Sequence, residues 1–92
     1  MKLEDEFHVE MLAIYDKCRA IGYRPNEFRN MVLKHGGVQA AKRLINRPET
    51  SGLAELALRN KLELSMENLM SRERYHPLFT NEEIATAASR LK

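Results

Sequence analysis

Apolar residues recur at steps of three and four along residues 3–20 of the chain. This period places them on one side of an α-helix, with the charged residues mostly outside the stripe, and it predicts the longest helix of the chain. Gly22 then suits a left-handed C-terminal cap, and Pro25 with Asn26 suits the start of a second helix that runs roughly to Lys34. The stripe contains Leu3, Phe7, Met11, Ile14, Tyr15 and Cys18.

Two adjacent glycines, Gly36 and Gly37, separate the second helical pattern from a third. Glycine adopts positive φ at little cost, so the pair is typical of a place where one helix stops and the next begins after a bend. A loop that cradles a phosphate is the competing interpretation, because free amides at a helix start can bind anions. The bend is favoured, because the segment lacks the strand, the glycine spacing and the lysine position of known phosphate loops.

The third pattern, from Val38 to about Asn46, has two unlike sides. The residue before a proline is pushed out of the helical region, so Arg47, which precedes Pro48, is expected in a turn. One side is therefore expected to be core and the other to be basic and exposed. The apolar arc contains Val38, Ala41, Leu44 and Ile45, and the opposite arc contains Gln39, Lys42, Arg43 and Asn46.

The pattern continues with two further helices and a short connection. Ser51 can cap a helix over residues 52–60, and Ser65 can cap another over residues 66–75, with Leu62 and Leu64 between them. The sequence "HPLF" (residues 76–79) is expected to break the second of these helices, because proline cannot continue one.

The last helix has the clearest local signal. In "TNEE", Thr80 and Glu83 have the spacing of a capping box, in which each side chain satisfies a free amide at the helix start. No segment shows sustained period-two alternation. The sequence therefore predicts an all-α fold: one compact domain over residues 1–92, with five or six short helices and a helix–turn–helix-like pair around Gly36 and Gly37. The predicted core is Phe7, Met11, Ile14, Phe28, Val32, Leu44, Leu56, Leu69, Phe79 and Ile84.

Composition narrows the class of protein. With 43% hydrophobic and 30% charged residues and no apolar run near the length of a membrane helix, the chain is expected to be globular and to have no membrane partner. The acidic start, "MKLEDEFHVE", lacks the apolar core of a secretory signal, and the single Cys18 has no intrachain partner for a disulfide. Both observations favour a cytoplasmic location.

Five sequence blocks resemble a small bacterial family of helical domains whose function is not established. They are "GYRPNEF", "HGGVQAAKRLI", "SGLAEL", "LELSMENLM" and "LFTNEEIATAASRL", in this order over about residues 20–91. The resemblance implies a self-contained bacterial domain. It carries no catalytic or binding residue over to this chain, and this chain has "LAELAL" where members often have aromatic residues.

Charge is distributed unevenly although its total is only +2. Residues 1–16 sum to −4, residues 17–47 to +7 and residues 48–92 to −1. Clustered positive charge attracts polyanions or acidic protein surfaces. We therefore expect a non-enzymatic binding module that contacts nucleic acid, since Lys, Arg, Gln and Asn contact phosphates and base edges. The expected nucleic-acid-binding residues are Arg29, Lys34, Gln39, Lys42, Arg43, Asn46 and Arg47.

A protein-interaction module is the alternative. The acidic start and the basic centre could pair across a homodimer, or the basic segment could dock an acidic protein. Enzyme and metal readings find no support: His8, His35 and His76 lie in different predicted elements, and Cys18 lies on an apolar stripe. Helical metal ligands lie three or four residues apart on one face, as Glu6 and Glu10 do, but His8 does not share that spacing. No catalytic residue, metal or cofactor is expected, and His35 is expected to end a helix, where the dipole favours its protonated form.

Overall fold

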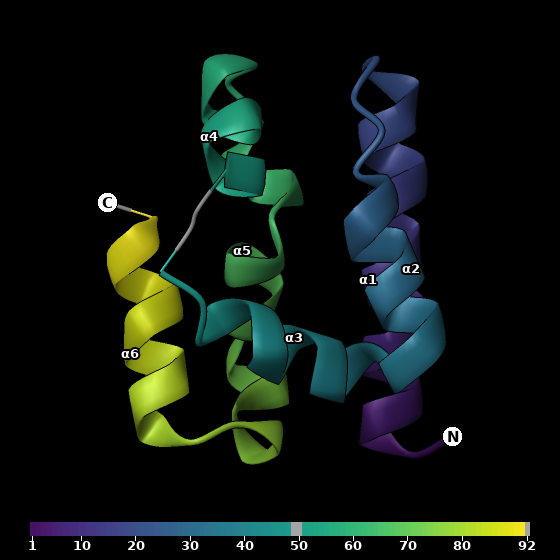
Figure 1. Cartoon of the computed structure of the whole chain (residues 1–92). Helices are drawn as coiled ribbons and strands as arrows, with labels where there is room; N and C mark the ends of the chain where they lie inside the picture. Colours follow the sequence, from purple (N-terminus) through teal and green to yellow (C-terminus); the bar gives the residue numbers. More distant parts are fainter. Residues whose placement is uncertain (49–50, 92) are drawn as a thin grey trace.

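Every regular element in the computed structural model, which describes residues 1–48 and 51–91, is a helix (Figure 1). This confirms the all-α class. The Cα radius of gyration, 12.0 Å, is that of a compact domain, for which about 12 Å is expected at this length. None of the described helices combines the length and the apolar character needed to cross a membrane. The elements are α1 (Leu3–Ala20), α2 (Asn26–His35), α3 (Gly37–Ile45), α4 (Ser51–Leu58), η1 (Leu62–Leu64), α5 (Met66–Met70), η2 (Glu73–Leu78) and α6 (Asn81–Arg90), where η marks 3₁₀ helices.

Helix α3 is the central connection of the fold. Figure 1 shows α1 and α2 side by side at one side of the molecule, α6 at the other, and α3 crossing between them. Accordingly α3 contacts α1, α2, α5 and α6. Its buried side therefore meets several helices, and only part of its surface is left for an external partner.

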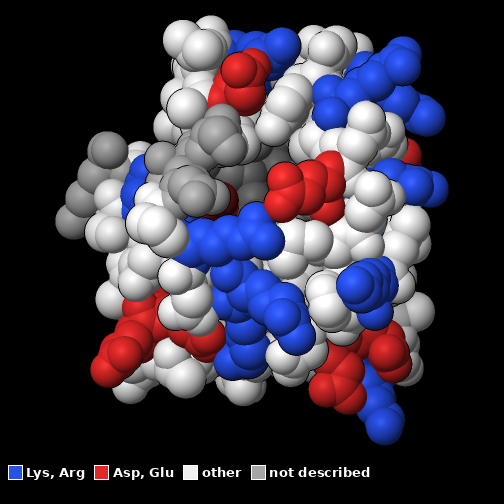
Figure 2. All heavy atoms as spheres, viewed as in Figure 1, with Lys and Arg blue, Asp and Glu red and all other residues white. Residues whose placement is uncertain are grey.

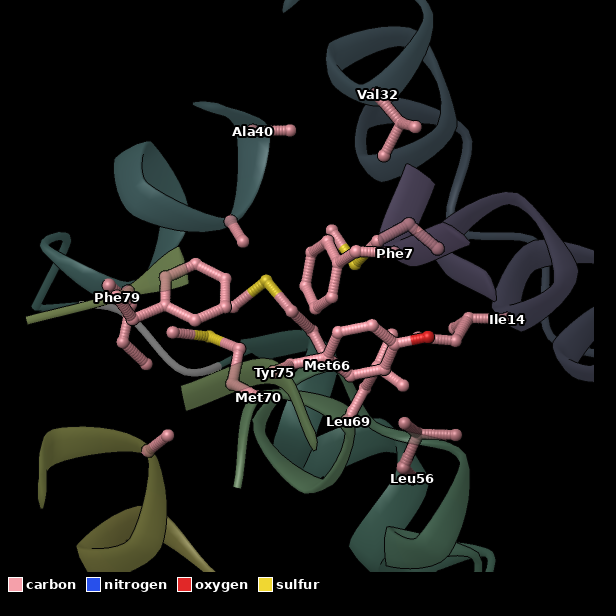
Figure 3. Close-up of a cluster of buried hydrophobic side chains, with 14 of the residues drawn as sticks. Phe7, Ile14, Val32, Ala40, Leu56, Met66, Leu69, Met70, Tyr75 and Phe79 are labelled. Carbon is pink, nitrogen blue, oxygen red and sulfur yellow. The ribbon is translucent and has the colours of Figure 1, made fainter. Parts of the chain in front are cut away.

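The core is centred on Phe7 of α1. Its ring meets Tyr75 edge-on at a centroid distance of 5.1 Å and Phe79 at 5.2 Å, a favourable aromatic geometry (Figure 3). Seven of the ten predicted core residues are buried: Phe7, Met11, Ile14, Val32, Leu56, Leu69 and Phe79. The other three, Phe28, Leu44 and Ile84, are only partly buried and pack against this cluster.

Gly22 ends α1 as predicted. Its φ is +85°, and the amides of Gly22 and Tyr23 donate to the carbonyls of Arg19 and Cys18. These two bonds form a Schellman motif, which satisfies carbonyls that the helix end would leave free. The local turn thereby sends α2 back along α1.

The two glycines between α2 and α3 serve different purposes. Gly36 has φ +85° and ψ 158°, a conformation essentially restricted to glycine, and it forms the predicted bend. Gly37 instead allows close contact with α1, because a Cβ on Gly37 would lie 2.6 Å from the Cα of His8. The Gly37 amide donates to Nδ1 of His8 at 2.9 Å, so His8 satisfies one of the free amides of α3.

The second half differs from the prediction in its helix ends. Ser65 caps α5 by accepting from the Asn68 amide at 3.0 Å, as predicted. However, α5 ends at Met70 instead of residue 75, and residues 73–78 form a 3₁₀ helix that contains Pro77. The reason is tertiary, since this tighter helix buries Tyr75 against Phe7. The expected cap by the Ser51 side chain lies outside the described part of the structure, although α4 begins at Ser51.

Candidate nucleic-acid interface

The seven residues expected to bind nucleic acid do not form one face. Lys42 and Asn46 turn toward α6, whereas Lys34, Arg43 and Arg47 line a hollow between α2 and α3. The remaining two, Arg29 and Gln39, lie elsewhere on these helices. Because the helical wheel considers one helix alone, it could not separate these groups.

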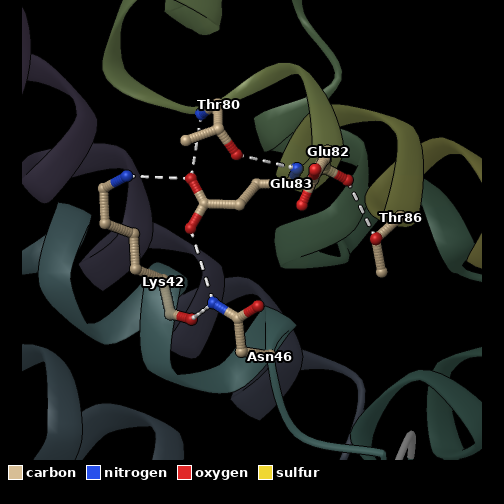
Figure 4. A network of polar contacts seen from close by, with 6 residues as sticks. All are labelled: Lys42, Asn46, Thr80, Glu82, Glu83 and Thr86. Atoms are coloured by element: carbon tan, nitrogen blue, oxygen red, sulfur yellow. Dashed lines mark hydrogen bonds and ion pairs between the residues drawn. The ribbon is translucent and has the colours of Figure 1, made fainter.

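Lys42 and Asn46 belong to the capping box of α6 (Figure 4). The predicted box is present: Thr80 Oγ1 accepts from the Glu83 amide at 3.1 Å, and Glu83 Oε1 accepts from the Thr80 amide at 2.9 Å. The same Oε1 pairs with Lys42 Nζ at 2.8 Å, and Asn46 Nδ2 lies 3.4 Å from Glu83 Oε2. The box therefore also joins α3 to α6.

This pairing engages Lys42 on the expected polar side of α3, while Gln39, Arg43 and Asn46 on the same side are exposed. The Lys42 side chain is only 29% exposed, and its ammonium lies 5.4 Å from the centre of the Phe79 ring, so it also makes a cation–π contact. Burial alone would raise the pKa of Glu83, but hydrogen bonds from Lys42 and the Thr80 amide lower it. Lys42 thus compensates the charge of Glu83 within the protein.

The basic hollow is the open depression of about 650 Å³ between α2 and α3. In the part of the chain that the structure describes, neither Lys34 nor Arg43 lies within ion-pair distance of a carboxylate. Arg47, by contrast, pairs with Glu27 at 2.8 Å at the rim of the hollow. Two cations are thus exposed to solvent on one small concave surface. It is lined by Glu27, Asn30, Met31, Lys34, His35, Arg43 and Arg47.

The positive charge of the basic hollow affects the pKa of His35. Desolvation and the nearby charges of Arg43 and Lys34 lower the pKa of His35. This direction is opposite to the one that the helix dipole alone would give at the end of α2. A neutral imidazole can donate one hydrogen bond and accept another, so His35 adds a polar contact to the hollow without a further charge.

Sequence reasoning missed Asn30, Met31 and His35 as parts of this surface. Their spacing in α2, together with Glu27 and Lys34, follows steps of three and four and places them on one side of that helix. That signal was present in the sequence, but only Arg29 and Lys34 of α2 were expected to bind, and the polar side of this helix was not considered as a whole.

Arg29 and Gln39 lie outside the basic hollow. The guanidinium of Arg29 stacks 5.5 Å from the centre of the Tyr15 ring on α1, and Tyr15 donates to Asn26 at 2.9 Å. Gln39 is exposed on α3. Cation–π contacts at exposed sites contribute only about 0.5–1 kcal/mol, so Arg29 can still turn toward a phosphate.

Acidic groups interrupt the basic surface. Figure 2 shows Lys and Arg side chains gathered over α3 at the centre of the drawn face, with acidic side chains on both sides of them. The acidic start of the chain is partly neutralised within the protein, because Glu6 pairs with Arg74, and Glu10 pairs with Arg72 at 3.1 Å and also accepts from Tyr75. These internal pairs leave less negative charge on α1 for a second copy of the chain.

The cysteine and two of the histidines, His8 and His76, are engaged in packing or in polar contacts within the protein. Cys18 is buried, and burial raises the pKa of its thiol. His8 accepts from the Gly37 amide, and a ring nitrogen of His76 lies 3.0 Å from the Ser71 carbonyl oxygen. Among residues 1–48 and 51–91, no three His, Cys, Asp or Glu side chains come together as a group that could hold a metal ion.

Comparison of the chain with models of protein families, with curated proteins and with solved structures found no match.

Proposed function

We propose that this chain is a non-enzymatic binding module that contacts nucleic acid through phosphate groups placed in the basic hollow. One observation carries the proposal: Lys34 and Arg43 line the same concave surface without an acidic partner among the described residues. The lowered pKa of His35 supports it, because that shift arises in part from the positive charge of these two side chains.

Phosphate contact is a better match to this surface than reading of base edges. Protein side chains that specify a sequence must reach base edges in a groove, whereas phosphate contacts require only positive charge and hydrogen-bond donors at the surface. Two of the candidates for base contact, Lys42 and Asn46, are held by Glu83. We therefore propose that α2 and α3 act as a helix–turn–helix-like pair that holds the backbone, with weak sequence preference.

The setting of this proposal is the reducing cytoplasm of a bacterium. The single cysteine, Cys18, has no partner for an intrachain disulfide, and this favours a reducing compartment.

A titration by fluorescence anisotropy tests the proposal. The parent protein should bind a labelled duplex or single strand at low salt, with an affinity that falls steeply as salt rises. Lys34→Ala with Arg43→Ala should weaken binding to all sequences alike and reduce the log–log salt slope by about one for each phosphate that the variant no longer neutralises. Both side chains are exposed, so the fold should be retained.

The matched control removes the same charge elsewhere. Lys2→Ala with Lys17→Ala also deletes two exposed cations, but neither belongs to the basic hollow. If this control weakens binding as much as the test variant, attraction is due to net charge alone and the site is wrong. No binding by the parent protein at low salt would refute nucleic-acid contact and leave an acidic protein partner, including a second copy of the chain, as the alternative.

A further inference from the structure

A second depression, the apolar hollow, lies between α4, α5 and the segment that leads into α2. Its volume is about 200 Å³. A cavity of about 150 Å³ in another protein is large enough to bind benzene, so this space suits a small organic molecule. Its apolar walls include Ile14, Phe28, Leu44, Leu53, Leu56 and Met66.

One charged pair interrupts these apolar walls. The Glu67 side chain is only 10% exposed and the Arg90 side chain 15%, yet Glu67 Oε2 and Arg90 Nη1 lie 3.8 Å apart. That distance is too long for a good hydrogen bond. Arg90 Nη2 donates to the Arg47 carbonyl at 2.5 Å, so the guanidinium is directed partly away from the Glu67 carboxyl group.

Burial raises the pKa of Glu67, although a hydrogen bond from its own backbone amide and the nearby Arg90 lower it. Among the described residues no buried polar side-chain atom lacks a partner, but the two oxygens of a carboxyl group have room for a further hydrogen bond from a molecule in the hollow. A hydroxyl or primary amide between the two side chains could accept from Arg90 and donate to Glu67, bridging the 3.8 Å gap.

The charges around the apolar hollow also indicate which polar group a molecule bound there would carry. Among the described residues, Arg90 faces Glu67 and Arg47 faces Glu27 at the rim, so each of these cations lies near a carboxylate. A charged ligand would add an uncompensated charge in a partly desolvated place, whereas an uncharged head would not. We propose that the apolar hollow binds a small uncharged molecule with a benzene- to indole-sized apolar body and one hydroxyl or primary amide head group.

This site is independent of the basic hollow. The two depressions share only the rim residues Glu27 and Arg47, and the walls of the apolar hollow come mainly from α1, α4 and α5. Failure of one proposal therefore leaves the other unaffected.

Five aromatic probes of similar size test the proposal. Benzyl alcohol and benzamide carry the proposed heads, benzylammonium and benzoate carry charges, and ethylbenzene has no polar head. Amide chemical shifts are followed at probe concentrations up to about 10 mM, which detects millimolar dissociation constants. Saturable shifts in α4 and α5 are expected for benzyl alcohol and benzamide, with affinity about tenfold above that for the charged probes.

Two variants locate the binding. Leu53→Trp places a larger ring at the wall and should lower affinity for benzyl alcohol at least about tenfold. Its matched control is Leu58→Trp in the same helix, where the native side chain is 82% exposed and affinity should not change. Glu67→Leu should weaken the binding of benzyl alcohol but not that of ethylbenzene, because only benzyl alcohol forms a hydrogen bond with the carboxyl group.

Three results would overturn the proposal. The first is the absence of saturable shifts for all five probes, which would mean that the hollow holds only solvent. The second is equal affinity in Leu53→Trp and Leu58→Trp, which would place binding elsewhere. The third is tightest binding of benzylammonium or benzoate, which would show that charge pairing and not a bridging head governs the site.

Discussion

Replacement of Gly37 by alanine tests how closely α3 approaches α1. The added Cβ would lie 2.6 Å from the His8 Cα, 3.1 Å from its amide nitrogen and 3.2 Å from its Cβ. Carbon atoms pack best at about 3.5–4.0 Å, so α1 and α3 must separate locally by about 1 Å. The obstacle is helix backbone, which cannot rotate away as a long side chain would. Such a shift also stretches the hydrogen bond from the Gly37 amide to His8 Nδ1.

The expected destabilisation follows from these two effects. Overpacking a buried position raises the free energy of the native state by about 1–3 kcal/mol, and loss of a hydrogen bond adds about 0.5–1.5 kcal/mol. We therefore expect Gly37→Ala to lower the free energy of unfolding by about 2–4 kcal/mol. A domain of this length has only about 5–14 kcal/mol in total. The melting temperature should fall by at least about 10 °C.

Urea and thermal unfolding followed by circular dichroism measure this effect, and Gly52→Ala is the matched control. Both glycines stand at the start of a helix without positive φ, but among the described residues a Cβ on Gly52 would meet the Tyr23 hydroxyl alone, at an ordinary 3.4 Å. Alanine favours helix over glycine, so Gly52→Ala should leave stability unchanged or raise it by up to about 1 kcal/mol. A loss below about 1 kcal/mol in Gly37→Ala would refute the close approach of α3 to α1.

Three further predictions concern the capping box and the buried acid. Thr80→Ala should lower the free energy of unfolding by about 0.5–2 kcal/mol, measured by urea unfolding, since it leaves a helix amide without its acceptor; an unchanged midpoint would contradict the cap. Lys42→Ala should cost about 1.5–3 kcal/mol near neutral pH, because it removes a charged hydrogen bond. The pKa of Glu83 is lowered in the folded state, so the ionised Glu83 contributes to stability above its unfolded-state pKa, and this contribution is lost as pH falls through the folded-state pKa. The destabilisation caused by Lys42→Ala should therefore become smaller in acid. A destabilisation that does not depend on pH would argue against the Lys42–Glu83 pair. The pKa of Glu67 is raised in the folded state, so the parent protein loses stability as pH rises from the unfolded-state pKa through the folded-state pKa. Glu67→Gln should remove this loss. In parallel melts, the stability of the variant relative to the parent should be greater at about pH 8 than at about pH 4. Equal differences at both pH values would contradict a raised pKa.

The sequence determined the elements whose signals are local. The stripe of α1, the Gly22 cap, the Ser65 cap and the Thr80 box each depend on residues within a few positions of one another, and each is present. Helical periodicity and capping hydrogen bonds act over one or two turns. They can therefore be read from the chain without knowledge of its neighbours in space.

Only the tertiary structure decided which polar side chains remain available. Lys42 and Glu83 are 41 residues apart in the chain, and Gly37 and His8 are 29 apart, so no local pattern could pair them. For this reason the seven expected contact residues fall into three groups. Two of them contact Glu83 of α6, three line the basic hollow between α2 and α3, and the other two lie elsewhere on these helices. The partner of the buried Glu67, Arg90, likewise comes from a distant helix, α6. A helical wheel predicts which side of a helix is polar, but packing against other helices decides which of those polar groups compensate one another and which remain exposed to a partner.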